Sequence, residues 1–187
     1  DLIPVIVSLT SFPDRINIVV KTIKTLLTQT MKPDMIILWL APEQFPNGEQ
    51  DLQKELIGLK KYGLTIDWYK DIRSYKKIIP TLKKYPDSII ITTDDDIYYA
   101  PDTVESLYNS YLKHPKEIHA HRCDWLKIDE NGIITWAKTR ELFKDLHRNE
   151  ASFRQRLTGY GAVLYSPSSL YKDVTNEELI SKTIPTH

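Results

Sequence analysis

The sequence lacks the features that mark several large classes of protein. Its one cysteine, Cys123, excludes an intrachain disulfide and favours a reducing compartment. Lys and Arg together number 25, as do Asp and Glu, so the net charge is zero; this argues against a nucleic-acid-binding protein that depends on bulk positive charge. No apolar run approaches the length of a transmembrane helix, and no signal peptide is visible. We therefore expect a cytoplasmic protein, peripheral to a membrane at most.

The remaining composition is that of an ordinary globular protein. Apolar residues make up 41% and charged residues 27% of the 187 residues. This length fits one domain with a sizeable core, because domains typically run to about 100–200 residues. There is no internal repeat and no low-complexity linker. The first residue is Asp1 rather than Met, so we expect a trimmed or excised segment.

The most informative stretch is an apolar run that leads directly into three carboxylates. Residues 88–93 are Ser-Ile-Ile-Ile-Thr-Thr, a pattern typical of a fully buried strand, and Asp94, Asp95 and Asp96 follow at once. Adjacent like charges at the edge of a core repel, so they indicate either a solvated acidic loop or a cation site. In an open α/β sheet, ligands bind just beyond the carboxyl ends of the strands. Oxygen ligands suit Mg²⁺ or Mn²⁺, which usually bind through one or two carboxylates plus substrate phosphates.

This stretch resembles the Asp-x-Asp signature of the GT-A-fold nucleotide-sugar glycosyltransferases, in which the motif ends an apolar strand. The resemblance implies that Asp96 binds the metal, and that Asp94 contacts the ribose or provides a second metal ligand. Because the run has three acids, the Asp-x-Asp motif can be aligned with it in more than one way. Asp95 is therefore also a candidate contact to the nucleotide-sugar donor. The alternative is an acidic loop tip.

Apolar periodicity predicts alternating strands and helices in the first half of the chain. Strands are expected over residues 3–9, 35–40, 64–69 and 88–93. Helical stripes are expected over residues 16–27, 52–59, 75–85 and 104–112. Gly63 should stop the second helix, and Pro80 should bend or shorten the third. This order is typical of an α/β fold with a mostly parallel sheet flanked by helices, here GT-A-like (Rossmann-like).

From residue 117 the pattern becomes irregular. We expect a strand over 118–123, a hairpin over 125–136 with its turn at 130–132, a strand over 161–165 and a helix over 168–182. Residues 137–158 are polar and support no assignment. The prediction is therefore one GT-A-like domain, with a nucleotide-sugar-binding half (1–116) and a small, irregular, β-containing acceptor half (117–187).

The loop after the first strand lies where the resembled family docks its nucleotide base. Arg15 could stack on or hydrogen-bond a uracil-type base, and Thr10 could bond the base edge or the ribose. The alternative for Arg15 is an exposed residue on a first helical turn.

A basic run precedes the acidic strand. Lys76 and Lys77 lie near the start of the third helix, where a phosphate or ribose could reach them. Lys83 and Lys84 are most simply a solvated last turn that suits the helix dipole. Charge runs are usually solvated faces, which is the alternative for the first pair too.

Candidates for the acceptor site lie in the second half. Trp125 could pack against a sugar ring, although it could equally be hairpin core. Residues Gly159, Tyr160 and Gly161 resemble the family's glycine-containing segment, where the backbone approaches both sugars; a simple turn is the alternative. His119 and His121 should share one face of a strand, where a hydrogen-bonded structural role is the commoner one.

A glycosyltransferase that inverts the anomeric configuration needs a general base, and no residue of the sequence is an obvious candidate. In the resembled family this carboxylate follows the glycine-containing segment, so we expect the catalytic domain to be truncated and the base to lie beyond His187. Asp124 is the fallback, with Glu177 and Glu178 in a surface helix. Some members of the family place a late histidine on the metal, which makes His187 a third candidate metal ligand.

The prediction is a metal-dependent glycosyltransferase that uses Mn²⁺ or Mg²⁺ and moves a sugar from a nucleoside-diphosphate donor, a UDP-sugar by family resemblance, to a glycan or glycoconjugate. The setting implied by the resemblance is bacterial polysaccharide assembly. A sugar-nucleotide-forming nucleotidyltransferase is one alternative; that class carries a Gly-rich loop after the first strand, and residues 10–15 contain no glycine. A non-catalytic nucleotide- or glycan-binding module is the other.

Overall fold

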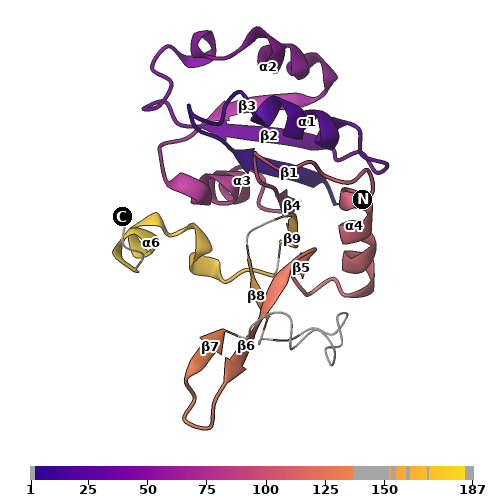
Figure 1. Cartoon of the computed structure of the whole chain (residues 1–187), viewed down its shortest axis with the longest axis vertical. Coiled ribbons are helices and arrows are strands. Elements are labelled where there is room, and N and C mark those ends of the chain that lie inside the picture. The colour runs from indigo at the N-terminus through magenta and orange to yellow at the C-terminus, as the bar shows by residue number, and fades with distance from the viewer. Residues whose placement is uncertain (1–2, 137–151, 153–154, 159–160, 168, 184–187) are drawn as a thin grey trace.

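The computed structural model describes residues 3–136, 152, 155–158, 161–167 and 169–183. Within these ranges a six-stranded sheet has the order β3-β2-β1-β4-β9-β5, and a three-stranded sheet has the order β7-β6-β8 (Figure 1). The larger sheet contains β1 (Val5–Thr10), β2 (Met35–Leu40), β3 (Leu64–Trp68), β4 (Ile89–Thr92), β5 (His119–Ala120) and β9 (Val163–Tyr165). The smaller contains β6 (Cys123–Ile128), β7 (Ile134–Trp136) and β8 (Gln155–Leu157).

The first four strands are parallel, as the alternating pattern predicted. β1 pairs with β2 on one side and with β4 on the other, and β2 pairs with β3. Thr10 lies opposite Trp39, and Ser8 lies opposite Thr92, so the carboxyl ends of β1, β2 and β4 meet at one edge of the sheet. These strands are apolar almost throughout because helices cover both of their faces.

The helices are α1 (Val19–Leu27), α2 (Lys54–Gly58), α3 (Ile79–Lys84), α4 (Thr103–Lys113) and α6 (Glu177–Thr183). α1, α2 and α4 bury Ile23, Leu56 and Leu107 in the main core, against alternate residues of the parallel strands. Full burial of each such side chain contributes about 1.5–3 kcal/mol. The opposite face is covered by α3, where the Thr81 hydroxyl lies 2.8 Å from Ser8 Oγ and accepts a hydrogen bond from Trp39 Nε1.

Two local predictions about helix ends are confirmed. Gly63 adopts a left-handed conformation with φ 113°, and it ends the 3₁₀ turn η2 (Leu59–Tyr62) that follows α2. The helix expected over 75–85 is broken into a 3₁₀ turn, η3 (Arg73–Lys77), and α3, with Pro80 in the first turn of α3. Proline lacks the N–H that an interior helical position must donate, so the helix restarts there.

The second half departs from prediction in two places. The single strand expected over 118–123 is wrong, because β5 ends at Ala120 and β6 begins at Cys123 in the other sheet. The helix expected over 168–182 is interrupted: a 3₁₀ turn, η4 (Lys172–Thr175), precedes α6. Asn176 separates them, and its side-chain oxygen accepts the N–H of Leu179, which caps the new helix.

The other elements of the second half agree with expectation. β6 and β7 form the predicted hairpin, in which Asp129 Oδ1 accepts the N–H groups of Asn131 and Ile133. β9 forms where a strand was expected and runs antiparallel to β4 and to β5. Of residues 137–158, the structure describes only Ser152 and 155–158.

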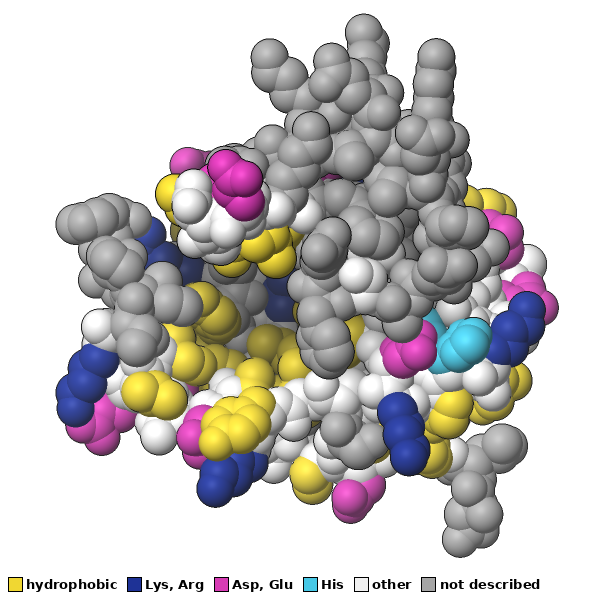
Figure 2. Space-filling view, turned by 90° about the horizontal axis from the view of Figure 1, so that it is seen from below, with side chains coloured by type: hydrophobic (Ala, Val, Ile, Leu, Met, Phe, Trp, Pro, Cys, Tyr) yellow, Lys and Arg dark blue, Asp and Glu magenta, His cyan; other side chains and the backbone are white. Residues whose placement is uncertain are grey.

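The hairpin of β6 and β7 projects from the end of the molecule opposite α2 (Figure 1). Seen from that end, hydrophobic side chains gather around a hollow (Figure 2). Within the ranges that the structure describes, the longest apolar helices fall short of what a membrane crossing requires.

Candidate functional site

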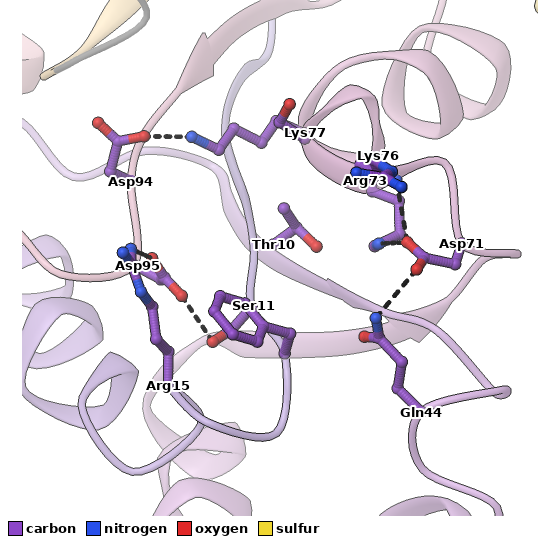
Figure 3. Close-up of a pocket in the computed structure, with 12 residues that line it drawn as sticks. Thr10, Ser11, Arg15, Gln44, Asp71, Arg73, Lys76, Lys77, Asp94 and Asp95 are labelled. Carbon is purple, nitrogen blue, oxygen red and sulfur yellow. Dashed lines mark hydrogen bonds and ion pairs between the residues drawn. The ribbon is translucent and has the colours of Figure 1, made fainter. Parts of the chain in front are cut away.

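A cavity of about 490 Å³ opens at the edge of the sheet where β1 and β4 end. Four segments supply its walls: the end of β1 with the loop after it, the loop after β2, the carboxylates after β4, and η3 (Arg73–Lys77) with Asp71 before it. Figure 3 shows the carboxylates Asp94 and Asp95 on one side and Asp71 on the other, with Thr10 between them. The lining residues are Thr10, Ser11, Phe12, Arg15, Gln44, Asp71, Arg73, Ser74, Lys76, Lys77, Asp94 and Asp95.

Asp95 is the buried member of the acidic run, with 6% of its surface exposed. Ser11 Oγ donates to its Oδ2 at 2.7 Å, and Arg15 donates to its Oδ1 at 3.1 Å. Thr22 on α1 donates to its backbone carbonyl at 3.0 Å. These bonds fasten the end of β4 to the loop after β1 and to α1, so both carboxylate oxygens of Asp95 are used inside the protein.

Arg15 bridges two of the three carboxylates. Its Nη1 lies 3.1 Å from Asp95 Oδ1 and 2.8 Å from Asp96 Oδ2, and its guanidinium lies 5.5 Å from the centre of the Phe12 ring. The hydrogen bond to Asp95, with the charges of Asp95 and Asp96, raises the pKa of Arg15 above its ordinary value. Its side chain is 43% exposed and lines the cavity. The predicted contact with a base stays a prediction.

Asp94 joins the first half of the chain to the second. Lys77 Nζ donates to Asp94 Oδ1, and the N–H of Gly161 donates to Oδ2 at 3.0 Å. The Tyr99 hydroxyl accepts the N–H of Asp94 at 2.7 Å and donates to the carbonyl of Gly161 at 3.3 Å. The acidic run, which has no basic neighbour in sequence, is therefore partly neutralised in the fold, because Lys77 and Arg15 supply two positive charges to its three carboxylates.

The opposite wall is a second charged cluster, which sequence reasoning did not anticipate. Lys76, 2% exposed, forms an ion pair with Asp71. Asp71 also accepts Gln44 Nε2 at 3.0 Å and the N–H of Arg73 at 2.9 Å. Burial alone would raise the pKa of Asp71, but the bonds from Lys76 and from the Arg73 N–H outweigh it and lower the pKa. Lys76 was one of two lysines that a phosphate or ribose was expected to reach; here its Nζ pairs with Asp71, and that contact stays a prediction.

Arg73 is held in an unusual backbone conformation at this wall. Its φ of 54° lies in the left-handed region, which costs a non-glycine residue about 1–2 kcal/mol. Residues in such conformations cluster at ligand sites, where surrounding structure holds them. The N–H of Arg73 bonds Asp71, which supplies part of that restraint.

Thr10, Ser11 and Asp71 all lie at or after the carboxyl end of a strand, but only Thr10 was predicted as a site residue. Thr10 Oγ1 donates to the carbonyl of Trp39 at 2.8 Å, so it ties β1 to β2 at the edge of the cavity. Ser11 and Asp71 were not identified, although both follow the carboxyl ends of strands. The rule that located Asp94 applies to them equally, but a single Ser or Asp in a loop gives no signal by itself.

The two histidines have the structural role that was the commoner expectation. His119 is buried; its Nδ1 lies 2.9 Å from Ser110 Oγ, and its Nε2 lies 3.0 Å from the carbonyl of His114. His121 Nε2 lies 2.8 Å from Ser106 Oγ, and burial lowers the pKa of His121. Both rings therefore lie within hydrogen-bond distance of serines of α4, although β5 ends at Ala120 and His121, which is exposed, lies beyond it.

Several predicted acceptor and metal residues lie outside what the structure describes. Gly159, Tyr160 and His187 are not in the described ranges, and neither is the side chain of Trp125. Gly161 is described, and its backbone bonds Asp94 and Tyr99. Asp124 lies on β6, opposite Arg156 of β8. The expected position of the general base stays a prediction.

The donor atoms at the end of β4 fit a hard divalent cation that shares its ligands with a substrate. Asp94 and Asp96 present carboxylate oxygens, and the Asp96 side chain is 40% exposed. Mg²⁺ and Mn²⁺ are commonly held by one or two carboxylates, with phosphate and water completing the shell. Among the described residues, no group of three His, Cys, Asp or Glu side chains that could hold a metal ion is found, so a cation on Asp94 and Asp96 would complete its shell with oxygens of substrate or water.

No protein-family model matches the sequence, and no curated protein matches it. Solved structures do match the fold. A 4-diphosphocytidyl-2C-methyl-D-erythritol synthase from Anaerococcus prevotii is similar over 100% of this chain and 79% of its own, with a TM-score of 0.54 and 15% identity. A CMP:2-keto-3-deoxy-manno-octonic acid synthetase complexed with CTP is similar over 99% of this chain and 80% of its own, with a TM-score of 0.54 and 10% identity.

A third match is the Staphylococcus aureus protein TarS, residues 1–349, in complex with UDP. The similarity covers 62% of this chain and 34% of the TarS chain, with 11% identity. Its TM-score of 0.47 is too low to carry an argument. At these identities the likeness shows the fold alone. The fold is the predicted one: a GT-A-like α/β architecture with a mostly parallel central sheet flanked by helices.

Proposed function

We propose that this chain is a nucleotide-dependent transferase that moves a sugar from a nucleoside-diphosphate donor to a glycan or glycoconjugate acceptor. The observation that carries the proposal is the pairing of Asp94, Asp95 and Asp96 with Lys77 and Arg15 at the carboxyl edge of the sheet. Carboxylates there can hold a cation, and the Lys77 ammonium can meet phosphate oxygens. The cavity beside them is large enough for a nucleotide.

The residues fall into three roles under this proposal. Asp96 and Asp94 hold Mn²⁺ or Mg²⁺, which stabilises the negative charge that develops on a departing nucleoside diphosphate. Lys77 and Arg73 bind the diphosphate from the η3 side of the cavity. Ser11, Phe12 and Arg15 border the base and ribose, with Phe12 supplying an aromatic face.

Glu177 was one of the alternative candidates for the general base, and its surroundings do not suit that role. Burial alone would raise the pKa of Glu177, but hydrogen bonds from Lys70, Lys83 and Tyr69 outweigh it and lower the pKa to about 2. A base works best with a pKa near the operating pH.

A nucleotidyltransferase is the second candidate, because two structures that match nearly the whole chain are synthases of cytidyl compounds. Against it, residues 10–15 contain no glycine, and the N–H of Arg15 already bonds the carbonyl of Phe12 at 2.9 Å. A glycine-rich phosphate-binding loop keeps its backbone N–H groups available for phosphate.

Two experiments separate the candidates. Thermal shift against UDP, GDP, CDP, UTP and CTP, each with Mn²⁺ or EDTA, identifies the nucleotide; a ligand at 100 times its Kd stabilises by about 2.7 kcal/mol. Incubation with UDP-sugars and glycan acceptors should then release nucleoside diphosphate. Release of pyrophosphate from UTP or CTP with a sugar phosphate would favour the second candidate, and binding without either product would indicate a non-catalytic binding module.

A further inference from the structure

Glu177 lies far from the cavity in sequence but binds both ends of a segment that lines it. Glu177 Oε1 accepts hydrogen bonds from the Tyr69 hydroxyl and from Lys83 Nζ, and Lys70 Nζ lies 2.6 Å from Oε2. Tyr69 and Lys70 come directly before residues 71–77, and Lys83 comes after them on α3. One carboxylate therefore holds the two flanks of the 71–77 segment.

The 71–77 segment supplies five of the twelve residues that line the cavity: Asp71, Arg73, Ser74, Lys76 and Lys77. It consists of a loop and the 3₁₀ turn η3, and it includes the left-handed Arg73. A segment of this kind has little regular structure of its own to hold its basic side chains in place. Strained backbone persists only where the surroundings restrain it.

The flanks themselves are anchored to the sheet. The N–H of Tyr69 donates to the carbonyl of Leu40 at 2.9 Å, and the Tyr69 ring meets the edge of Trp39 with 6.2 Å between ring centres. Lys83 also donates to the Tyr69 hydroxyl at 3.1 Å. Glu177, whose side chain is 16% exposed, closes this arrangement from α6 and forms ion pairs with both Lys70 and Lys83.

We infer that Glu177 is a positioning residue for the nucleotide phosphates, acting through Tyr69, Lys70 and Lys83 on the 71–77 segment. The inference deepens the proposed function and rests on it for the identity of the ligand. It also gives α6, which lies in the acceptor-side half of the chain, a role in donor binding. Small displacements of groups that bind phosphate are costly, since a shift of about 1 Å can lower a rate by roughly a hundredfold.

The test compares Glu177→Gln with Glu178→Gln, its neighbour on the same helix, whose carboxylate forms an exposed pair with Lys182 at 2.6 Å. Hydrogen–deuterium exchange of the ligand-free protein should be faster at residues 71–77 in Glu177→Gln only. Calorimetry should show UDP binding weakened by roughly tenfold in that variant, with uridine binding unchanged, because the phosphates are the part that the segment contacts. A loss of general stability would weaken both ligands alike.

Lys83→Gln provides a second variant should Glu177→Gln fold poorly. It removes one partner and leaves Lys70 on Glu177, so it should produce a smaller change in the same direction in both measurements. Equal exchange at 71–77 in both glutamate variants, or faster exchange with unchanged UDP affinity, would overturn the inference. If the wild-type protein binds no nucleotide, the proposed function fails, and the exchange comparison alone then decides whether Glu177 holds the segment.

Discussion

Lys77 Nζ donates to one oxygen of Asp94, and the N–H of Gly161 donates to the other. A carboxylate oxygen has two lone pairs and can accept a second bond, so a cation or a ribose hydroxyl can share Asp94, but the Lys77 charge opposes a cation there. A bound diphosphate would draw Lys77 away from Asp94. The two ligands of the proposed site are thereby coupled through one side chain.

Lys77→Met should have opposite effects on the two ligands. Removing the ammonium should weaken UDP binding by roughly tenfold or more, since a charge-assisted hydrogen bond contributes about 1.5–3 kcal/mol. The same change should strengthen Mn²⁺ binding in the absence of nucleotide, because Asp94 loses its cationic partner. Calorimetry of each ligand alone measures both. Lys60→Met is the control, an exposed lysine paired with Glu49; weaker binding of both ligands to Lys77→Met would contradict the coupling.

Asp96→Asn should remove the dependence of nucleotide binding on divalent metal. The neutral amide is a poor ligand for a hard cation, while Arg15 keeps its bond to Asp95 and holds the loop in place. The measurement is UDP affinity with Mn²⁺ and with EDTA. Asp87→Asn, an exposed acid before β4, should keep the wild-type difference. Equal affinities of the wild-type protein in Mn²⁺ and EDTA would refute the metal assignment itself.

Replacing Arg73 by glycine and by alanine separates its backbone from its side chain. Both changes remove the guanidinium, but only alanine keeps the steric cost of φ 54°. The glycine variant should therefore be more stable than the alanine variant by about 1 kcal/mol, reduced somewhat by the greater entropy of glycine in the unfolded chain. Urea denaturation of the two proteins gives the difference directly. An alanine variant as stable as the glycine variant would show that this position carries no strain.

Glu177 should make the protein sensitive to acid. Its pKa falls from 4.5 to about 2 on folding, so its stabilising contribution is complete above pH 4.5 and is lost as the pH falls towards 2. The shift corresponds to about 3 kcal/mol at most. The stability difference between wild type and Glu177→Gln should therefore be large at pH 7 and shrink below pH 4.5. Urea midpoints measured across this range provide the check, and a difference independent of pH would rule out the ion pairs as its source.

The strands and helices of the first half were predictable because each buried strand is a continuous apolar run and each helix carries an apolar stripe. The place of Asp94, Asp95 and Asp96 followed from the same patterns, since the carboxyl end of a buried strand is where ligands meet such a sheet. The second half was less predictable. Its strands are only two to six residues long, and whether residues 118–123 continue as one strand depends on β9, which pairs with β5.

The partners of the site residues could not be read from the sequence. Arg15 meets Asp95 across 80 positions, and Lys83 meets Glu177 across 94. Lys83 and Lys84 do lie exposed in the last turn of α3, as expected, yet they pair with Glu177 and Asp67, and Glu177 is not the simple surface residue that was expected. A charged side chain shows its sign in a sequence but not which opposite charge the fold brings to it.

The position of β9 has a consequence for how the chain can be divided. β9 lies between β4 and β5, so residues 163–165 complete the hydrogen bonding of a central strand from the first half. A fragment ending at residue 116 would leave one side of β4 as an open edge, its N–H and C=O groups unpaired beside Ile89, Ile90 and Ile91. Open apolar edges pair with other chains. We expect such a fragment to self-associate in sedimentation experiments, and a monodisperse monomer would show that the two halves are separable after all.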